Sequence, residues 1–339
     1  AELLCNIHPW AGQVRFARTG GECAAVAVRI VRATTDRSVI AICGYHGWQD
    51  WYLAANLGES ESLRGHLLPG LEPLGVPVEL RGTALTFEYE NLEQFDKVIK
   101  KAGDRLAAVI MEPCRYKDPE PGFLEYVKSK CKQAGALLIF DEITIGWRYH
   151  CGGAHLKLGV DPDIAIFAKA LGNGHPISAI VGTAEAMAGA HSSFISSTYW
   201  TESVGPAAGI ATLKKMMSID APSHVAGVGE AVTANWQKAA VKHGIKIKSG
   251  DGYPCLAHFA FDHEQANELR TLYTQLMLEK GFLAGVSIYP TMAHTSEIIE
   301  KYGEAVDSVF EEIALAIEKD NISSKLKGSP AHTGFRRLL

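Results

Sequence analysis

The sequence predicts an α/β protein: a mostly parallel sheet with helices on both faces, followed by a smaller α/β C-terminal domain. Short continuous apolar runs alternate with helix-like stretches over the first two-thirds of the chain. Such runs are typical of strands buried on both faces of a parallel sheet. The length of 339 residues makes two domains the default. After Gly244 the pattern changes, and a further set of strand-like and helix-like stretches indicates a second domain.

The composition excludes several classes of protein. Hydrophobic residues make up 47% of the chain and charged residues 21%, with a net charge of −5, which gives no basic surface for nucleic acid. No apolar run approaches the roughly 20 residues that span a bilayer, so we expect no membrane partner. The seven cysteines form an odd, dispersed set without a CxxC pair. That pattern favours reduced thiols and a cytoplasmic protein over a disulfide framework or a metal site.

The strands and helices of the first domain are predicted from the alternation of apolar runs with helical periodicity. Continuous apolar runs predict strands at residues 38–43, 106–111, 136–140, 164–168 and 180–182. Helical periodicity predicts helices at residues 21–33, 92–102, 124–134 and 185–189, and then at 205–217 and 225–243, where the chain leaves the sheet.

The C-terminal part has its own set of elements. Strands are predicted at residues 245–248 and 255–261, and helices at 265–280 and 296–318. We therefore expect a large domain over residues 1–225, a small domain over 226–322 and a loosely held basic tail over 323–339.

Polar residues follow three of the predicted strands, where each apolar run stops. They are Glu112, Asp141 and Lys169. Ligands of such sheets bind beyond the carboxyl ends of the strands. The spacing of 169 − 141 = 28 residues is about one crossover helix with its connections. Asp141 and Lys169 are therefore predicted to open into one site from neighbouring strands.

Lys169 stands out because apolar residues surround it in the stretch "DIAIFAKAL". Burial disfavours the charged ammonium and lowers its pKa, so the free amine can form a Schiff base with an aldehyde. The simpler alternative is a structural lysine paired with a buried carboxylate. Asp141 has an alternative role too, as the cap of a following helix.

Two glycine-containing stretches are candidate contacts for a ligand. Gly20 and Gly21 precede a helix in "RTGGE", where backbone N–H groups and the helix dipole favour a phosphate. Tyr45 and His46 lie between two glycines in "GYHGWQDW", which leaves room for a ring to lie against a flat ligand. A phosphate cradle, an aromatic platform, a carboxylate and a desolvated lysine together predict pyridoxal 5′-phosphate (PLP) as the cofactor.

The same stretches carry a family resemblance. The chain resembles the class III aminotransferases of PLP fold type I, in the branch of glutamate-1-semialdehyde aminomutase-like proteins. The motifs extend over residues 12–315 in the family's order: "RTGGE", "GYHGWQDW", "IMEP", "LLIFDEITIGWR", "FAKALGNGHPISAIVG", "SSTYWTESVGPAAGIATL" and "AHTSEIIEKY". The resemblance implies a large PLP-binding domain and a smaller C-terminal domain.

The resemblance implies a role for each matching residue near the cofactor ring. Lys169 would bind the cofactor as a Schiff base, and Asp141 would pair with the pyridine nitrogen. Ile143 would pack on one face of the ring and Tyr45 on the other, with His46 beside this platform.

The resemblance also implies how the phosphate is held. Backbone groups of Gly20 and Gly21 would contact it. Thr198 matches a threonine that reaches the phosphate of the neighbouring subunit's cofactor, so a homodimer with shared active sites is expected.

The implied reaction moves an amino group between a small amino donor and a carbonyl acceptor. An intramolecular amino shift, as in glutamate-1-semialdehyde 2,1-aminomutase, would use the same residues. Members of the family carry a long segment before the point that matches residue 1. A non-catalytic or accessory subunit of a split enzyme is therefore a third alternative.

Overall fold

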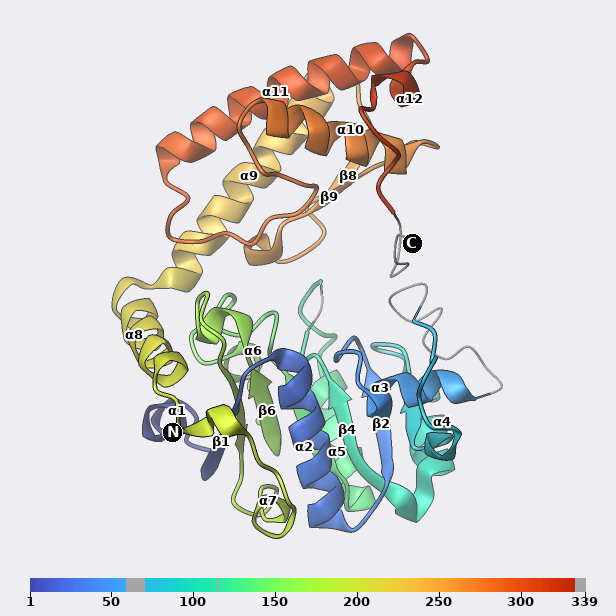
Figure 1. Cartoon of the computed structure of the whole chain (residues 1–339), viewed down its shortest axis with the longest axis vertical. Coiled ribbons are helices and arrows are strands. Elements are labelled where there is room, and N and C mark those ends of the chain that lie inside the picture. Colours follow the sequence, from blue (N-terminus) through green and yellow to red (C-terminus); the bar gives the residue numbers. More distant parts are fainter. Residues whose placement is uncertain (59–70, 115, 333–339) are drawn as a thin grey trace. The chain divides into compact units, whose positions relative to one another are not determined.

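The computed structural model of the protein describes residues 1–58, 71–114 and 116–332, and Figure 1 shows the arrangement of their helices and strands. The chain divides into two compact units, of which the first is Ala1–Ser218 and the second begins at Ile219. The boundary predicted after residue 225 lies inside helix α9 (Ala221–His243). The assignment of the units as domains stays a prediction.

The first unit is built on a seven-stranded sheet. Its strand order is β1 (Gln13–Ala17), β7 (Ser178–Gly182), β6 (Ile164–Phe167), β5 (Leu137–Asp141), β4 (Leu106–Met111), β2 (Val39–Cys43) and β3 (Ala84–Thr86). The pairs from β6 to β3 are parallel, whereas β7 runs antiparallel to both of its neighbours. The predicted mostly parallel α/β architecture is confirmed.

The strands are apolar throughout because both faces of the sheet are covered. All five residues of β2 are buried. Alternate residues join different clusters: Ile40 and Ile42 pack with helix α2 (Gly20–Thr35), while Val39 and Ala41 pack with α4 (Leu92–Ala102) and α5 (Phe123–Ala134). Burial of each such side chain contributes about 1.5–3 kcal/mol, which explains the continuous apolar runs.

Helix α2 lies along the sheet in Figure 1 and begins at the glycines expected to bind phosphate. Thr19 caps it: its hydroxyl accepts a hydrogen bond of 3.2 Å from the amide of Glu22. The Glu22 carboxylate in turn accepts a 2.7 Å hydrogen bond from the amide of Arg18. This reciprocal capping fixes the entry of the chain into the helix and leaves the amides of Gly20 and Gly21 at its open end.

Further elements belong to the first unit, and the last of its helices, α8, ends one residue beyond the boundary at Ser218. The α-helices are α1 (Glu2–Ile7), α3 (Asp50–Leu53), α6 (Ala154–Leu158), α7 (Gly189–Ser192) and α8 (Val204–Ile219). The 3-10 helices are η1 (Ala54–Leu57), η2 (Val78–Leu80), η3 (Gly103–Arg105), η4 (Lys169–Leu171) and η5 (Thr198–Thr201).

The second unit packs three long helices on a two-stranded sheet. Its helices are α9, α10 (Ala266–Glu279), α11 (Ser296–Glu318) and the short α12 (Ile322–Lys325) and η6 (Pro254–Leu256), with antiparallel strands β8 (Ile247–Ser249) and β9 (Phe259–Phe261). Three of its buried polar side chains form a chain of hydrogen bonds, in which the hydroxyl of Tyr302 lies 2.8 Å from both Trp236 Nε1 and the Tyr273 hydroxyl.

Several sequence-based boundaries need correction. The helix expected at residues 185–189 is wrong: turns occupy most of this range, and α7 begins only at Gly189. The Thr183 hydroxyl accepts from the amide of Ala186, which closes a turn there. The strand expected over residues 255–261 is only β9, because η6 occupies its first residues. Strands β1 and β3 were not anticipated.

The tail is not loosely held over its described part. The amide of Lys327 donates to the Gln275 side chain at 2.8 Å, and that of Ala331 donates to the Thr271 hydroxyl at 2.9 Å. Both acceptors are on α10, so residues 327–331 are fixed along that helix. The end of the predicted tail, residues 333–339, lies outside the described residues.

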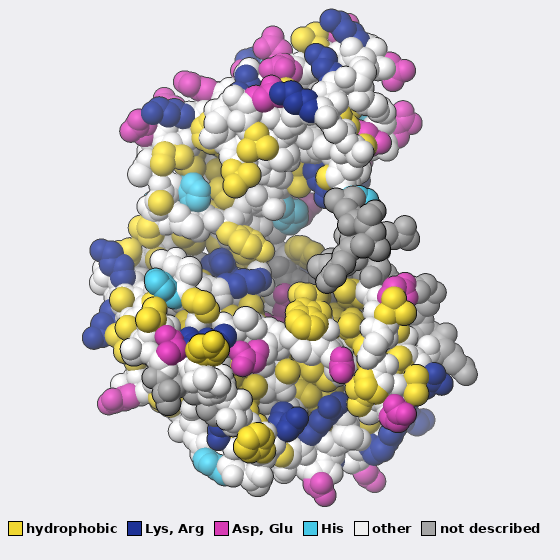
Figure 2. All heavy atoms as spheres, viewed as in Figure 1, with side chains coloured by type: hydrophobic (Ala, Val, Ile, Leu, Met, Phe, Trp, Pro, Cys, Tyr) yellow, Lys and Arg dark blue, Asp and Glu magenta, His cyan; other side chains and the backbone are white. Residues whose placement is uncertain are grey.

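Charge is mixed on the visible face. Figure 2 shows acidic and basic side chains interspersed among apolar ones, in keeping with the small net charge of −5. Across the described ranges, none of the helices combines the length and apolar character needed to cross a bilayer.

Candidate active site

Asp141 is the last residue of β5 and is only 4% exposed. One of its carboxylate oxygens accepts a 3.0 Å hydrogen bond from the amide of Ile143, and the other lies 2.7 Å from His46 Nδ1. A buried carboxylate is costly unless it is paired and hydrogen-bonded. Asp141 meets this requirement while its position at the strand end keeps it at the edge where ligands of such sheets bind.

His46 is 2% exposed and lies between two acceptors. Its Nε2 lies 3.1 Å from the carbonyl oxygen of Cys43, at the end of β2. A carbonyl oxygen can only accept, so Nε2 carries a hydrogen and donates. The Nδ1 of His46 lies 2.7 Å from the Asp141 carboxylate. His46 therefore ties the loop after β2 to the end of β5.

Lys169 follows the end of β6 and has a left-handed backbone, with a φ of 42°. Such a conformation is strained for a residue with a side chain, and strain of this kind concentrates at functional sites. Its Nζ donates a 2.7 Å hydrogen bond to the hydroxyl of Thr144. Burial, and next the charge of Arg148, lower the pKa of the Lys169 amine, against the opposing effect of Asp141 and Glu112.

The structure brings Lys169 and Asp141 to the same edge of the sheet. Strands β5 and β6 are parallel neighbours, with Asp141 opposite Ile166. Lys169 comes three residues later and binds Thr144, which comes three residues after Asp141. The expectation that both side chains arise from neighbouring strands is therefore confirmed.

The glycines before α2 lie against two other parts of the site. A Cβ added to Gly20 would lie 3.0 Å from Ile143 Cδ1, so the helix start and the residue expected at the ring face are in close contact. A Cβ on Gly21 would lie 2.4 Å from Gln49 Nε2, and one on Gly47 would lie 3.2 Å from the Cα of Gly21. The loop after β2 therefore approaches the helix start closely because both contain glycine.

Tyr45 lies in this same loop and is exposed over 36% of its surface. Its ring meets that of Tyr52 edge-on, with centroids 5.8 Å apart. The Tyr52 hydroxyl donates to the carbonyl oxygen of Gly44 at 3.0 Å and so fixes the start of the loop. Burial raises the pKa of the Tyr45 hydroxyl, which keeps the ring neutral. One side of the ring is thus packed and part of it faces outward.

Thr198 is exposed and begins η5. The described contacts do not connect it with Lys169 or Asp141. It lies instead on a turn that Ser197 caps, with the Ser197 hydroxyl 3.4 Å from the amide of Tyr199. The proposal that Thr198 contacts a phosphate therefore rests on the family resemblance.

Two residues at the site were not anticipated from the sequence. Thr144 accepts the hydrogen bond of Lys169, and Gln49 places its amide against Gly21 and Gly47. A polar residue three positions after Asp141 is a signal that could have identified Thr144. For Gln49, the signal is its position just before α3, next to the expected platform.

These residues fit PLP. The amides at the start of α2 have no partners within the helix and suit an anion such as a phosphate. Gly20, at the helix start expected to bind the phosphate, is in close contact with Ile143, the residue expected to pack on the ring. No space is left for a side chain at position 20. Asp141 supplies a buried, oriented carboxylate, and Lys169 supplies an amine whose pKa is lowered. Each chemical group that PLP requires is present in the first unit.

Comparison with known proteins supports this chemistry. The family described as "Aminotransferase class-III" matches residues 1–310. A 3-aminobutyryl-CoA aminotransferase of Cloacimonas acidaminovorans is 30% identical over 322 residues, covering 91% of this chain and 73% of the relative. A 2′-deamino-2′-hydroxyneamine transaminase of Streptomyces kanamyceticus is 28% identical over 314 residues, covering 90% and 74%.

The fold is shared with solved structures. The FumI protein of Sphingopyxis sp. MTA144, in its PLP internal aldimine form, superimposes with a TM-score of 0.83 at 22% identity, over 94% of this chain and 75% of that one. Class III aminotransferases use PLP, so the predicted cofactor is confirmed at the level of the family. The chain belongs to the class III aminotransferase family and is a PLP-dependent transaminase.

Proposed function

We propose that the chain moves an amino group between a small amino donor and a carbonyl acceptor, with Lys169 as the residue that binds PLP covalently. The observation that carries the proposal is the placement of a lysine of lowered pKa beside a buried carboxylate at one sheet edge. A neutral amine is required both to attach an aldehyde and to accept a proton from a substrate carbon.

When bound, PLP supplies an electron-accepting ring that stabilises negative charge on the substrate carbon. The chain's own residues then have distinct tasks. Asp141, held by His46, would pair with the ring nitrogen. The Thr144 hydroxyl orients the Lys169 amine, which takes and returns the proton. Gly20 and Gly21 offer backbone amides to the phosphate, while Ile143 and Tyr45 confine the ring.

We also propose a homodimer in which Thr198 of one subunit reaches the phosphate site of the other. Thr198 is exposed, as such a role requires. Helix α8 follows it and is rich in apolar residues, yet its buried residues are only Gly205, Gly209 and Leu213. Exposed apolar side chains next to Thr198 include Tyr199 at 65% and Val204 at 60%. An apolar surface of this kind favours contact with another chain.

The substrate class follows from the family. One relative is named for 3-aminobutyryl-CoA and the other for 2′-deamino-2′-hydroxyneamine. Both names describe the transfer of an amino group on a small molecule. We therefore propose a small-molecule amine as donor and an oxo compound as acceptor, and a reducing, cytoplasmic compartment for the dispersed cysteines.

The decisive experiment is reductive labelling. Purified protein with PLP is treated with borohydride, and the labelled peptide is identified by mass spectrometry. Label is expected at Lys169 and absent from Lys169→Ala, while the exposed-lysine control Lys97→Ala labels normally. Retention of label in Lys169→Ala would disprove the assignment.

Titration with candidate amines separates the kinds of reaction. Loss of the visible absorbance band with one amine, reversed by an added oxo acid, supports intermolecular transfer. Turnover without any external oxo acid would instead place the chain in the aminomutase-like branch. A protein that binds PLP but reacts with no amine would be an accessory subunit.

A further inference from the structure

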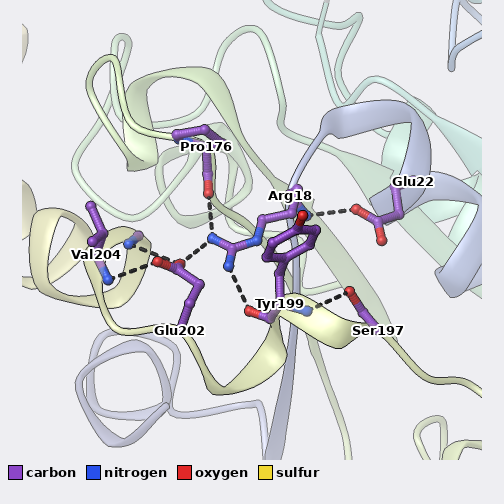
Figure 3. Close-up of polar contacts among 8 residues, drawn as sticks. Arg18, Glu22, Pro176, Ser197, Tyr199, Glu202 and Val204 are labelled. Carbon is purple, nitrogen blue, oxygen red and sulfur yellow. Dashed lines mark hydrogen bonds and ion pairs between the residues drawn. The ribbon is translucent and has the colours of Figure 1, made fainter.

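Arg18 is a cation next to the phosphate loop that the proposed function does not use. It precedes the Thr19 cap, and its amide donates to Glu22 at 2.7 Å. Its side chain crosses to parts of the chain far away in sequence, as Figure 3 shows. Nη1 donates to the carbonyl oxygen of Pro176 at 2.9 Å, and Nη2 donates to that of Tyr199 at 2.5 Å.

The third acceptor of Arg18 is Glu202. Nη1 forms a hydrogen-bonded ion pair with this carboxylate. Glu202 also accepts from the amides of Val204 at 2.9 Å and Gly205 at 3.1 Å. It therefore caps α8 while it binds Arg18. The hydrogen bond from Arg18 is the largest cause of the lowered pKa of Glu202, so this carboxyl group stays ionised near neutral pH.

The geometry requires an arginine. The guanidinium is planar and offers several donors at once, whereas a lysine ammonium is a single point. Arg18 uses this shape to bind three acceptors while it lies 5.7 Å from the centre of the Tyr199 ring. The side chains of Arg18 and Glu202 are only 19% and 27% exposed, so solvent screens the pair less than it screens pairs on the open surface.

The segments that Arg18 joins all have roles in the proposed function. The start of α2 offers amides to the phosphate, Pro176 is in the connection that follows Lys169, and Tyr199 is next to Thr198. We propose that Arg18 is a positioning residue that sets the phosphate loop of its own chain and the Thr198 turn in one fixed arrangement. In this role Arg18 would act through the segments that it joins, and the inference rests on the proposed function.

In a homodimer, Arg18 would link the phosphate contacts of two active sites. The phosphate loop serves the subunit's own cofactor, whereas Thr198 serves the partner's cofactor. One guanidinium would therefore determine the geometry of phosphate contacts in both sites. Loss of Arg18 should weaken binding of the phosphate group and leave the Schiff-base chemistry of Lys169 unaffected.

The test compares PLP with pyridoxal, which has the same aldehyde and ring but no phosphate. Dissociation constants for both are measured on apoprotein by absorbance. In Arg18→Met, PLP affinity is expected to fall about tenfold, as for the loss of a charge-assisted contact, with pyridoxal affinity unchanged. Arg18→Lys should lie in between. Arg29→Met is the matched control, because Arg29 is on α2 and reaches Phe194 at 3.4 Å without touching the Thr198 turn.

Two further variants keep the test decisive. Glu202→Gln preserves the shape of the acceptor and should reproduce part of the loss. In a Thr198→Val background, Arg18→Met should cost less, because part of its effect is already gone. Equal weakening of PLP and pyridoxal, or no weakening of either, would overturn the inference. The proposed function would fail separately, if wild-type protein gave no borohydride label at Lys169.

Discussion

The Asp141 carboxylate and the His46 imidazole lie 2.7 Å apart, both almost completely buried. This contact joins the end of β5 to the loop that follows β2. The imidazole is the side-chain partner of this buried carboxylate, beside the backbone amide of Ile143.

The first prediction concerns this pair. His46→Ala removes a partner of the buried carboxylate, and such losses cost about 3–5 kcal/mol of folding free energy. The free energy of unfolding of apoprotein, measured with urea, should fall by this order. Lys97→Ala, which breaks the exposed pair with Glu93, is the control and should leave the urea midpoint unchanged. An unchanged midpoint in His46→Ala would show that Asp141 is satisfied without the imidazole.

The second prediction concerns pH. An ordinary lysine is half neutral near pH 10.4, about the value of model peptides. Because the pKa of Lys169 is lowered, the neutral amine becomes available at lower pH. The rate of covalent attachment of PLP to apoprotein should therefore rise with pH and level off below the ordinary lysine range. Stopped-flow absorbance across a pH series measures this profile.

Two variants should shift that profile in opposite directions. Arg148 lowers the pKa of Lys169, so Arg148→Met should move the midpoint to higher pH. Asp141 raises the same pKa, so Asp141→Asn should move the midpoint to lower pH. If the midpoint of the pH profile moved in the same direction in both variants, this account of the electrostatics at Lys169 would be contradicted.

The third prediction concerns Thr144. Thr144→Val keeps the shape of the side chain and removes the acceptor of the Lys169 hydrogen bond. A hydrogen bond of this kind is worth about 0.5–1.5 kcal/mol net, so the rate of amino transfer should fall up to about tenfold. Thr144→Ser restores the hydroxyl and should recover most of the rate. Single-turnover kinetics with an excess of amine measure the step, and equal rates in the Val and Ser variants would exclude the role.

The fourth prediction concerns the close approach at the start of α2. In Gly21→Ala the new methyl group would lie 2.4 Å from Gln49 Nε2, so the amide must move. We expect weaker PLP binding and partial recovery in Gly21→Ala/Gln49→Ala, where space is restored. Gly227→Ala, in α9 with no neighbour within 4 Å of the added carbon, is the control and should be neutral or slightly stabilising. No recovery in the double variant would show that the methyl group itself blocks the phosphate.

The fifth prediction concerns shared active sites. Lys169→Ala and Thr198→Val subunits are mixed, unfolded and refolded together. A hybrid dimer has one site with an intact Lys169 and an intact Thr198 from the other chain. About half of the dimers should then carry one site of wild-type PLP affinity, as expected for random pairing of two subunits. Absence of such sites would mean that Thr198 does not act across the dimer.

The sequence predicted the parts of this site that depend on strand ends. Strands β4, β5 and β6 are apolar runs, and a polar residue at the end of such a run must lie at the carboxyl edge. Asp141 and Lys169 could be paired for that reason. Strands β1 and β3 were missed because β1 contains Gln13 and Arg15, and β3 has three residues only.

The remaining features depend on contacts between distant segments. The antiparallel direction of β7 cannot be read from a short apolar run. Gln49 is identified only by its approach to Gly21, and Arg18 only by its reach to Tyr199 and Glu202. In the sequence, Gln49 and Arg18 are ordinary polar residues that stand beside recognisable motifs.

The reversed direction of β7 has a consequence for redesign of the protein. Because β6 and β7 are antiparallel neighbours, residues 168–177 turn back at the reactive edge and remain next to Lys169. The connection from β7 to α7, by contrast, leaves the sheet at the opposite edge. Loop grafting aimed at new amines should therefore exchange residues 173–175 and keep Pro176, whose carbonyl oxygen binds Arg18. The connection after β7 is a poor place for insertions, because Ala186 and Met187 are fully buried.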